Sequence, residues 1–175
     1  MRATATSLIR IVASAVVTVV LTAGAARGQN AAWVNPSGGS YDVAGNWVPG
    51  VVPRASNNIL INVGTAYNIG FQADRDAAGL SISNNLELTF SADGTGVAAR
   101  TFSLTGSAVI DRAELTLGDL SQGGLLNMQV GGKLDMRGGR LDLLNGAQLT
   151  SQTSLTNSNS IEGAGGVDST IMVRG

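Results

Sequence analysis

Between Glu114 and Gly146 the chain repeats one short pattern four times: Glu114-Leu-Thr-Leu-Gly118, Leu126-Asn-Met-Gln-Val-Gly-Gly132, Lys133-Leu-Asp-Met-Arg-Gly-Gly139 and Arg140-Leu-Asp-Leu-Leu-Asn-Gly146. Apolar and polar residues alternate within each unit, which is the periodicity of a β-strand with one buried face. The predicted buried positions are Leu115, Leu117, Met128, Val130, Leu134, Met136, Leu141 and Leu143, and the predicted outward positions are Thr116, Gln129, Asp135 and Asp142. The glycine that ends each unit predicts a turn, so these short strands bury their apolar face only by stacking on one another.

Strand-like segments also precede the repeats. They are Ile59–Val63, Tyr67–Phe71, Leu80–Ile82, Leu86–Phe90, Thr101–Gly106 and Ala108–Ile110. The charged tripeptide Asp74-Arg75-Asp76 predicts a turn. No apolar stripe with the period of an α-helix occurs between Asn58 and Gly175, so this part of the chain is predicted to be all-β.

The spacing of the leucines favours a parallel β-solenoid. Leu115, Leu134 and Leu155 follow one another at nearly equal intervals, and Leu141 and Ile161 are separated by a similar interval. Three short strands per turn of about 20 residues fit one coil of a β-helix. The alternative is a β-sandwich, for which Asp93-Gly94 and Asn145-Gly146 are candidate hairpin turns. The solenoid is favoured because most turns here are Gly-Gly or Gly-Ser and join very short strands.

Residues 1–28 have the layout of a secretory signal peptide. Arg2 and Arg10 precede an apolar run that ends at Leu21, and small residues continue to Gly28. A membrane anchor is the alternative, but the run is interrupted by Ser14 and Thr18 and is shorter than the roughly 20 apolar residues of a spanning helix. The predicted organisation is therefore a signal peptide at 1–28, an N-terminal cap segment at 29–57 and β-repeats at 58–175. The predicted location is extracellular or on the cell surface, with no membrane insertion after cleavage.

Composition excludes several classes of function. The chain has 11 basic and 12 acidic residues, and removal of the signal peptide with its arginines leaves it mildly acidic, so nucleic acid is not an expected partner. The sequence contains neither cysteine nor histidine. Disulfides, the commonest general base and the commonest metal ligand are therefore missing. We expect no catalytic residue, no metal and no cofactor.

The cap segment holds Trp33, Tyr41, Trp47 and all three prolines. One interpretation is an aromatic platform that stacks on sugars, since these rings combine a flat apolar face with a polar edge. The favoured interpretation is that the three rings close the open end of a stacked β-core, because solenoids need an atypical terminal unit.

A second group of candidate binding residues lies within the repeats: Lys133, Asp135, Arg137, Arg140 and Asp142. Asp135 and Asp142 occupy equivalent places in successive units, which predicts that they point outward and lie near each other on neighbouring strands. Together with the three cations they are candidates for binding Ca²⁺ or a uronic-acid polymer, as in β-helix polysaccharide lyases. The favoured interpretation is a solvated face with weak surface ion pairs.

The residues Trp33-x-x-x-x-Gly38-Gly39-x-Tyr41-x-x-x-x-Asn46-Trp47, followed by Pro53 and Gly-punctuated strands, resemble the start of autotransporter-associated β-strand repeat proteins and related surface proteins with a C-terminal sorting anchor. The resemblance implies a right-handed β-solenoid that is exported and has a structural or adhesive role. It carries no catalytic residue over to this chain. Residues 58–175 themselves contain neither a sorting helix nor a dockerin-like Ca²⁺ loop.

These observations predict a non-enzymatic extracellular module for which adhesion or contact with a polysaccharide or another cell-surface component is the expected activity. A carbohydrate-active β-helix enzyme, similar to a polysaccharide lyase, is the alternative. The strand-like residues Ser169–Arg174 present Ile171 and Val173 on one face with no polar cap after them. This predicts that the repeats are incomplete at the C-terminus or that this edge associates with another copy.

Overall fold

The computed structural model describes residues 28–93, 98–119, 124–144, 146–151, 154–157, 161–163 and 170–173. These residues are mostly β and form an 11-stranded mixed sheet and a 5-stranded parallel sheet. The helical segment among them is the short 3-10 turn Ala44–Asn46. The predicted signal peptide, residues 1–28, lies outside the described residues except for Gly28.

Each predicted strand-like segment overlaps a strand, but Ala108–Ile110 and the unit Glu114–Gly118 belong to one strand, and strands also occur where none was predicted. The strands are β1 (Asn30–Trp33), β2 (Gly39–Ser40), β3 (Trp47–Val48), β4 (Asn58–Ile61), β5 (Ala66–Phe71), β6 (Arg75–Ala77), β7 (Gly79–Ser83), β8 (Glu87–Ala92), β9 (Arg100–Leu104), β10 (Ala108–Leu117), β11 (Leu126–Val130), β12 (Lys133–Leu143), β13 (Gln148–Ser151), β14 (Ser154–Asn157), β15 (Ile161–Gly163) and β16 (Thr170–Val173). The turn predicted at Asp74-Arg75-Asp76 is wrong, because Arg75 and Asp76 belong to β6.

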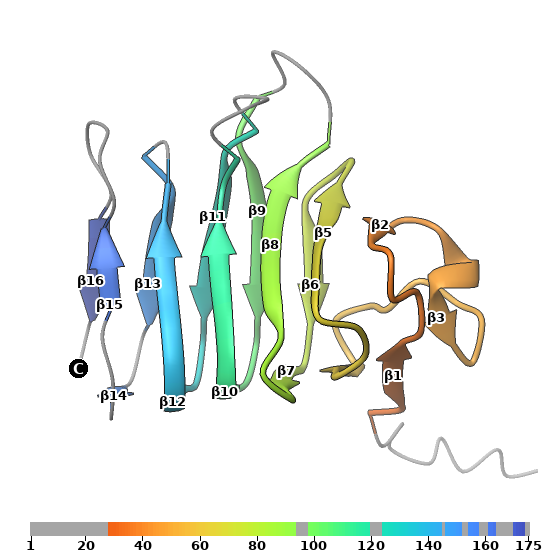
Figure 1. The fold of residues 1–175 in the computed structure, drawn as a ribbon, viewed down its shortest axis with the longest axis horizontal. Coiled ribbons are helices and arrows are strands. Elements are labelled where there is room, and N and C mark those ends of the chain that lie inside the picture. The colour runs from red at the N-terminus through yellow and green to blue at the C-terminus, as the bar shows by residue number, and fades with distance from the viewer. Residues whose placement is uncertain are drawn as a thin grey trace, which may run out of the picture.

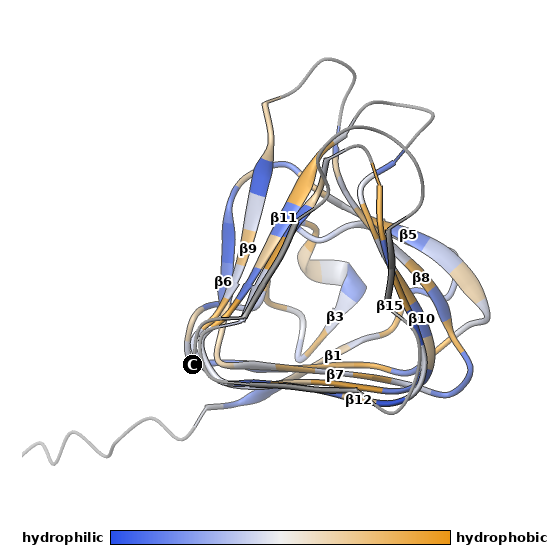
Figure 2. Cartoon of the chain, turned by 90° about the vertical axis from the view of Figure 1, so that its left-hand side faces the viewer, coloured by the Kyte–Doolittle hydropathy of each residue, from blue (hydrophilic) through white to orange (hydrophobic). Residues whose placement is uncertain are grey.

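The strands stack into three walls (Figures 1 and 2). The first wall contains β1, β4, β7, the start of β10, the start of β12, and β14. The second contains β2, β5, β8, the ends of β10 and β12, and β15. The third contains β6, β9, β11, β13 and β16. From β4 onward the chain visits the walls in this order on each circuit, for example along β7, β8 and β9.

Neighbouring strands within a wall are parallel and in register. In the first wall Ile59 pairs with Leu80, Leu80 with Ala108, and Ala108 with Leu134. The antiparallel pair among the described strands is β1 with β3. A sandwich built from hairpins is therefore wrong, since its strands would pair antiparallel.

The pairing of the leucines is only partly as predicted. Leu134 pairs with Leu155, and Leu141 pairs with Ile161, as their spacing in the sequence suggests. Leu115 does not pair with Leu134; it lies opposite Leu88 on one side and Leu141 on the other. The pairing of Leu115 with Leu134 fails because circuits differ in length.

The core lies between the walls, where the inward residues of each circuit meet. All eight predicted buried positions of the repeats are confirmed, with at most 1 % of each residue exposed. Alternation along the strand fixes which side chains point inward, so the local pattern was sufficient to identify them. Aromatic rings fill the core toward the N-terminal end, where Phe71, Phe90 and Phe102 contact one another at 5.3–5.9 Å between centroids.

A bend, rather than a turn, joins the first and second walls in β10 and β12. Arg112 in β10 has a φ of +50°, and Gly138 and Gly139 at the matching place in β12 have φ values of +77° and +126°. The two repeat units Lys133–Gly139 and Arg140–Gly146 were predicted to be separate strands, but β12 runs through both as far as Leu143. Left-handed residues redirect the strand here, and its pairing with β10 skips Arg112 and Gly138 and then resumes in the same register.

Candidate functional site

The rings of Trp33, Tyr41 and Trp47 lie inside the N-terminal end of the stack, with 0, 1 and 2 % of each residue exposed. Trp47 contacts the other two edge to face, at 4.9 Å between centroids in both cases. Tyr41 stacks on Phe71 at 4.8 Å. The interpretation of these rings as a platform for sugars is wrong, because a buried ring offers no face to a ligand. Their positions fit the alternative, in which they close the end of the core.

The polar edges of both indoles are also engaged within the protein. Trp33 Nε1 donates to the carbonyl oxygen of Asn35 at 2.6 Å, and Trp47 Nε1 donates to that of Tyr41 at 2.8 Å. Asn46 ties the segment together, since its Nδ2 donates to the carbonyl oxygen of Ser40 at 2.8 Å. Trp33, Asn46 and Trp47 therefore hold the fold of the cap segment.

The five charged candidates of the repeats all lie on one strand, β12. Asp135 pairs with Val109 of β10, whereas Asp142 pairs with Thr116 on the other side of the bend. The expectation that the two carboxylates are neighbours across adjacent strands is therefore wrong. The cause is the continuity of β12, which places both aspartates on the same strand but on two different walls.

Asp135 forms ion pairs with two cations from its own strand. Its Oδ2 accepts from Arg137 Nη2 at 2.8 Å and lies 3.5 Å from Lys133 Nζ. The hydrogen bonds from Arg137 lower the pKa of the Asp135 carboxyl, and the charges of both cations act in the same direction. Lys133 and Arg137 are thus already matched to a carboxylate, as expected for a face with surface ion pairs.

Asp142 is less solvated than its position in the pattern predicts. It points outward from the core but is only 5 % exposed, and its Oδ1 accepts from Arg140 Nε at 2.7 Å. A charged hydrogen bond of this length compensates a covered carboxylate for lost hydration. Asp142 and Arg140 therefore form a partly buried ion pair, in contrast to the solvated pairs predicted here.

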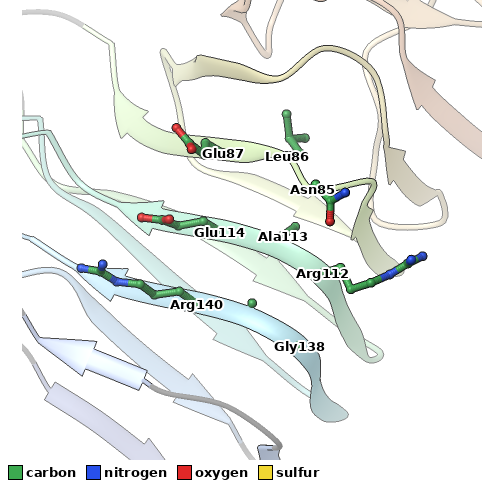
Figure 3. A pocket seen from close by; sticks show the side chains of 9 residues that line it. Asn85, Leu86, Glu87, Arg112, Ala113, Glu114, Gly138 and Arg140 are labelled. Carbon is green, nitrogen blue, oxygen red and sulfur yellow. The ribbon is translucent and has the colours of Figure 1, made fainter.

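A groove of about 370 Å³ runs across the bend between the first and second walls (Figure 3). One side carries Glu87, Glu114 and Arg140, which are consecutive partners on β8, β10 and β12. The other side carries Asn85 and Arg112. We call this feature the corner groove. The residues that line the groove between its two sides include Leu86, Ala113, Gly138 and Gly139, of which Leu86 and Ala113 are buried.

Glu114 lies between Glu87 and Arg140 in the row on one side of the corner groove. Burial raises the pKa of the Glu114 carboxyl above its ordinary value of about 4.5. Arg140 acts in the opposite direction, while the charges of Asp142 and Glu87 and a hydrogen bond with Asp142 raise the pKa further. The groove thus holds one carboxyl that is easier to protonate than an exposed glutamate.

Two further hollows lie on the second wall. One, of about 360 Å³, shares Glu87 and Glu114 with the corner groove and extends over Tyr67, Thr89 and Thr116. The other, of about 290 Å³, is lined by polar residues of β2, β5 and β8, which include Ser40, Asn68 and Ser91. The outer face of the second wall therefore carries two hollows beside the corner groove, and other hollows of similar volume lie over the cap segment around Val51 and Arg54.

Sequence reasoning missed Glu87, Glu114, Asn85 and Arg112. The intervals from Glu87 to Glu114 and from Glu114 to Arg140 are both longer than the predicted period, so the repeat pattern did not place these residues side by side. The available signal was the pair Asn84-Asn85, because asparagine tolerates the left-handed conformation found there, with φ values of +82° and +53°. Without the register, this signal marks a turn and not a groove.

The described residues contain no group of three or more acidic side chains arranged to hold a metal ion. In the same part of the chain, no helix has the length and apolar character needed to cross a bilayer.

Comparison with family models, with curated proteins and with solved structures gave no match for this chain. A proposed function for this chain therefore rests on its corner groove and its three stacked walls.

Proposed function

We propose that this chain is a right-handed parallel β-solenoid that acts as a secreted or cell-surface structural and adhesive module, without catalytic activity, and that it contacts extracellular polysaccharide. The observation that carries the proposal is the in-register parallel pairing of each wall over successive circuits, as in the series Ile59, Leu80, Ala108 and Leu134. Stacked circuits of this kind build an elongated scaffold with long, regular outer faces. Such faces suit repeated contacts with a polymer.

The proposed extracellular location rests on the layout of residues 1–28. The proposal includes the kinship with autotransporter-associated repeat proteins and sorting-anchored surface proteins suggested by the Trp, Gly and Tyr pattern of the cap segment. It can be tested by expressing the chain with its own leader in a Gram-negative host. We expect protein outside the cytoplasm whose N-terminus lies near Gln29. Full-length protein that retains Arg2 in the cytoplasm would contradict the location.

A lyase-like enzyme is less well supported. A lyase for acidic polymers needs cations that are free to bind uronate groups, whereas Lys133 and Arg137 already engage Asp135, and Arg140 engages Asp142. The deciding experiment incubates the protein with pectin and alginate and follows both sedimentation with the polymer and release of unsaturated products. Product formation that is lost in Asp142→Asn would establish the enzyme and refute the non-catalytic module.

The proposed partners also include a second copy of the chain, through the C-terminal edge of the stack. Strands β14 and β15 pair with β12, and β16 pairs with β13. Among the described residues, no strand pairs with the other edge of these three. Unpaired backbone groups of parallel strands favour the addition of a further strand.

A further inference from the structure

We propose that the corner groove binds a neutral, hydroxyl-rich oligosaccharide, held between the row Glu87–Glu114–Arg140 and the opposite pair Asn85 and Arg112. This inference rests on the proposed contact with polysaccharide and specifies where that contact is made and which sugars make it. It differs from the candidate residues of the sequence, which pointed to the buried rings and to acidic polymers.

The arrangement of the two sides supports this ligand class. Figure 3 shows Glu87, Glu114 and Arg140 extending one above another to one side, while Arg112 extends the opposite way. Carboxylates only accept hydrogen bonds, guanidinium groups only donate, and the Asn85 amide does both. A sugar hydroxyl donates and accepts at one atom, so adjacent hydroxyls match this mixture of groups better than a ligand of one charge does.

The charges disfavour an acidic sugar. Glu87 and Glu114 supply two of the three charged groups on one side of the groove, and the third, Arg140, already donates to Asp142. A uronate placed here would lie against two carboxylates and would gain mainly from Arg112, whose side chain is 69 % exposed and whose Nε lies 3.5 Å from Asp111 Oδ1. Solvent exposure weakens that attraction. A neutral glycan avoids the repulsion and keeps the hydrogen bonds.

The dimensions and direction also fit a glycan. The groove crosses three parallel strands spaced about 4.8 Å apart, which gives it a length of roughly two sugar rings. Its volume of about 370 Å³ falls within the usual range for small-ligand sites. Because the groove runs across the strands and not along an edge, an extended peptide lying in it could not add to the sheet by backbone pairing.

The backbone conformation of Arg112 is a reason to expect that its side chain has a function. With φ at +50° it occupies a conformation that costs a non-glycine residue about 1 kcal/mol or more. Glycine occupies the matching place on β12, at Gly138. Arg112→Gly should therefore fold at least as well as the wild type while removing the guanidinium from the groove.

The test titrates isotope-labelled protein with cellohexaose, xylohexaose, mannohexaose and chitohexaose, and with hexagalacturonate as the acidic comparator. We expect at least one neutral hexasaccharide to shift the amide signals of residues 85–87 and 112–114 at millimolar concentration, and hexagalacturonate to bind more weakly. Arg112→Gly and the double variant Glu87→Gln/Glu114→Gln should each weaken binding about tenfold or more, as expected when hydrogen bonds to charged groups are lost. Asp76→Asn, at an exposed position of β6 in the third wall, is the matched control and should leave binding unchanged.

The outcomes separate this inference from the proposed function. Shifts confined to the hollow around Ser40, Asn68 and Ser91 would overturn the corner groove but keep the contact with polysaccharide. Tighter binding of hexagalacturonate would overturn the selection for neutral sugars. Absence of binding to all four neutral sugars would overturn the inference, whereas the extracellular scaffold would still be tested by the export experiment. Unchanged affinity in a well-folded Arg112→Gly variant would remove Arg112 from the site.

Discussion

The hydroxyl group of Tyr41 has no hydrogen-bond partner among the described residues, although the residue is only 1 % exposed. Burial raises the pKa of this phenol, so Tyr41 stays neutral at every physiological pH. A buried hydroxyl without a partner costs about 1–3 kcal/mol. The ring itself is held by Trp47, Phe71 and Phe102, so the fold uses its aromatic surface and not its hydroxyl.

Tyr41→Phe should therefore stabilise the protein. We expect the free energy of unfolding to rise by about 1 kcal/mol, which corresponds to about 3 °C in Tm for a domain of this size. Tyr67→Phe is the comparison, because the Tyr67 hydroxyl also lacks a partner but the residue is only half-buried, with a pKa raised to about 12. Its effect should be smaller. Thermal unfolding of Tyr41→Phe at a lower Tm than the wild type would mean that the hydroxyl is satisfied by a bound water.

Glu114→Gln should stabilise the protein at neutral pH. Because the pKa of Glu114 is raised in the folded state, its protonated form is favoured there, and the associated stability is present below pH 4.5 and is lost as the pH rises through the folded pKa. Glutamine keeps the shape of the protonated acid and cannot ionise. The gain in Tm over wild type should therefore be clear at neutral pH and should vanish well below pH 4.5.

Thermal unfolding across this pH range provides the measurement, with Asp76→Asn as the control for a general loss of negative charge. A gain that is equal at all pH values would show that ionisation of Glu114 is not its source. Since the double variant Glu87→Gln/Glu114→Gln is expected to weaken sugar binding, higher stability together with weaker binding would distinguish a groove residue from one that supports the fold.

At the scale of elements, strand β12 runs through two of the four repeat units and bends at Gly138 and Gly139. A Cβ at Gly139 would meet the backbone nitrogen of Ala113 at 2.8 Å and would also contact the carbonyl oxygen of Ala113. The φ of +126° at Gly139 adds strain for any other residue. The bend of β12 thus depends on a close approach of its backbone to β10.

Gly139→Ala should destabilise the protein by about 3 kcal/mol or more, because neither backbone can move away without breaking the pairing of β10 with β12. Gly50→Ala is a matched control, since Gly50 has a φ of +84° but no atom lies within 4 Å of its added Cβ. It should cost only the strain of about 1–2 kcal/mol. Urea denaturation measures both. Equal losses would contradict the close approach of β10 and β12.

The sequence predicted the direction of side chains much better than the course of the backbone. Leu134, Met136 and Leu141 face inward as predicted, because alternation is a local property of an extended strand. Gly139 was predicted to end a strand, but whether a glycine ends or bends a strand depends on the partner alongside it. Strand β6 was missed for a related reason: Arg75 forms an ion pair with Asp42, and pairing with β9 overrides the turn preference of its aspartates.

The candidate sites also combine features that the sequence predicts with features that only the tertiary structure decides. Composition identified Trp33 and Trp47 as unusual, but only packing decides whether a ring points into the core or toward solvent. The corner groove brings together Glu87 and Glu114 through a register that depends on unequal circuit lengths. Such a register is a tertiary property, and no pattern confined to one circuit contains it.

At the scale of the whole molecule, the two ends of the stack differ. At the N-terminal end, β2, β3 and β6 are the outermost strands, and the buried rings of Trp33, Tyr41 and Trp47 close the core. The short strand β3 is also followed by Pro49, which has no backbone N–H to offer another strand. At the other end, β14, β15 and β16 present an edge that pairs with no described strand. Ile171 is in register with Leu149, a buried residue, and Val173 with Ser151.

The protein should therefore self-associate through its C-terminal edge. Sedimentation velocity over a range of concentrations should show oligomers of the wild type, and Ile171→Lys/Val173→Lys should shift the population toward a monomer that remains folded. A matched change at the opposite end, Val48→Lys, should leave association unchanged. If the wild type stays monomeric at high concentration and the double variant unfolds, these two residues belong to a closed core.

The corners that join the three walls differ in how much their length varies from circuit to circuit. From the second wall to the third, the segments Leu88–Phe102 and Leu115–Met128 are much longer than the corresponding segment Leu141–Leu149 of the next circuit. From the third wall to the first, the segments Phe102–Ala108 and Met128–Leu134 are equal in length. The variation in length is thus greatest at one corner, so foreign segments can be grafted there while the flanking strands keep their partners. A library of inserts displayed at that corner would form a column along one side of the molecule.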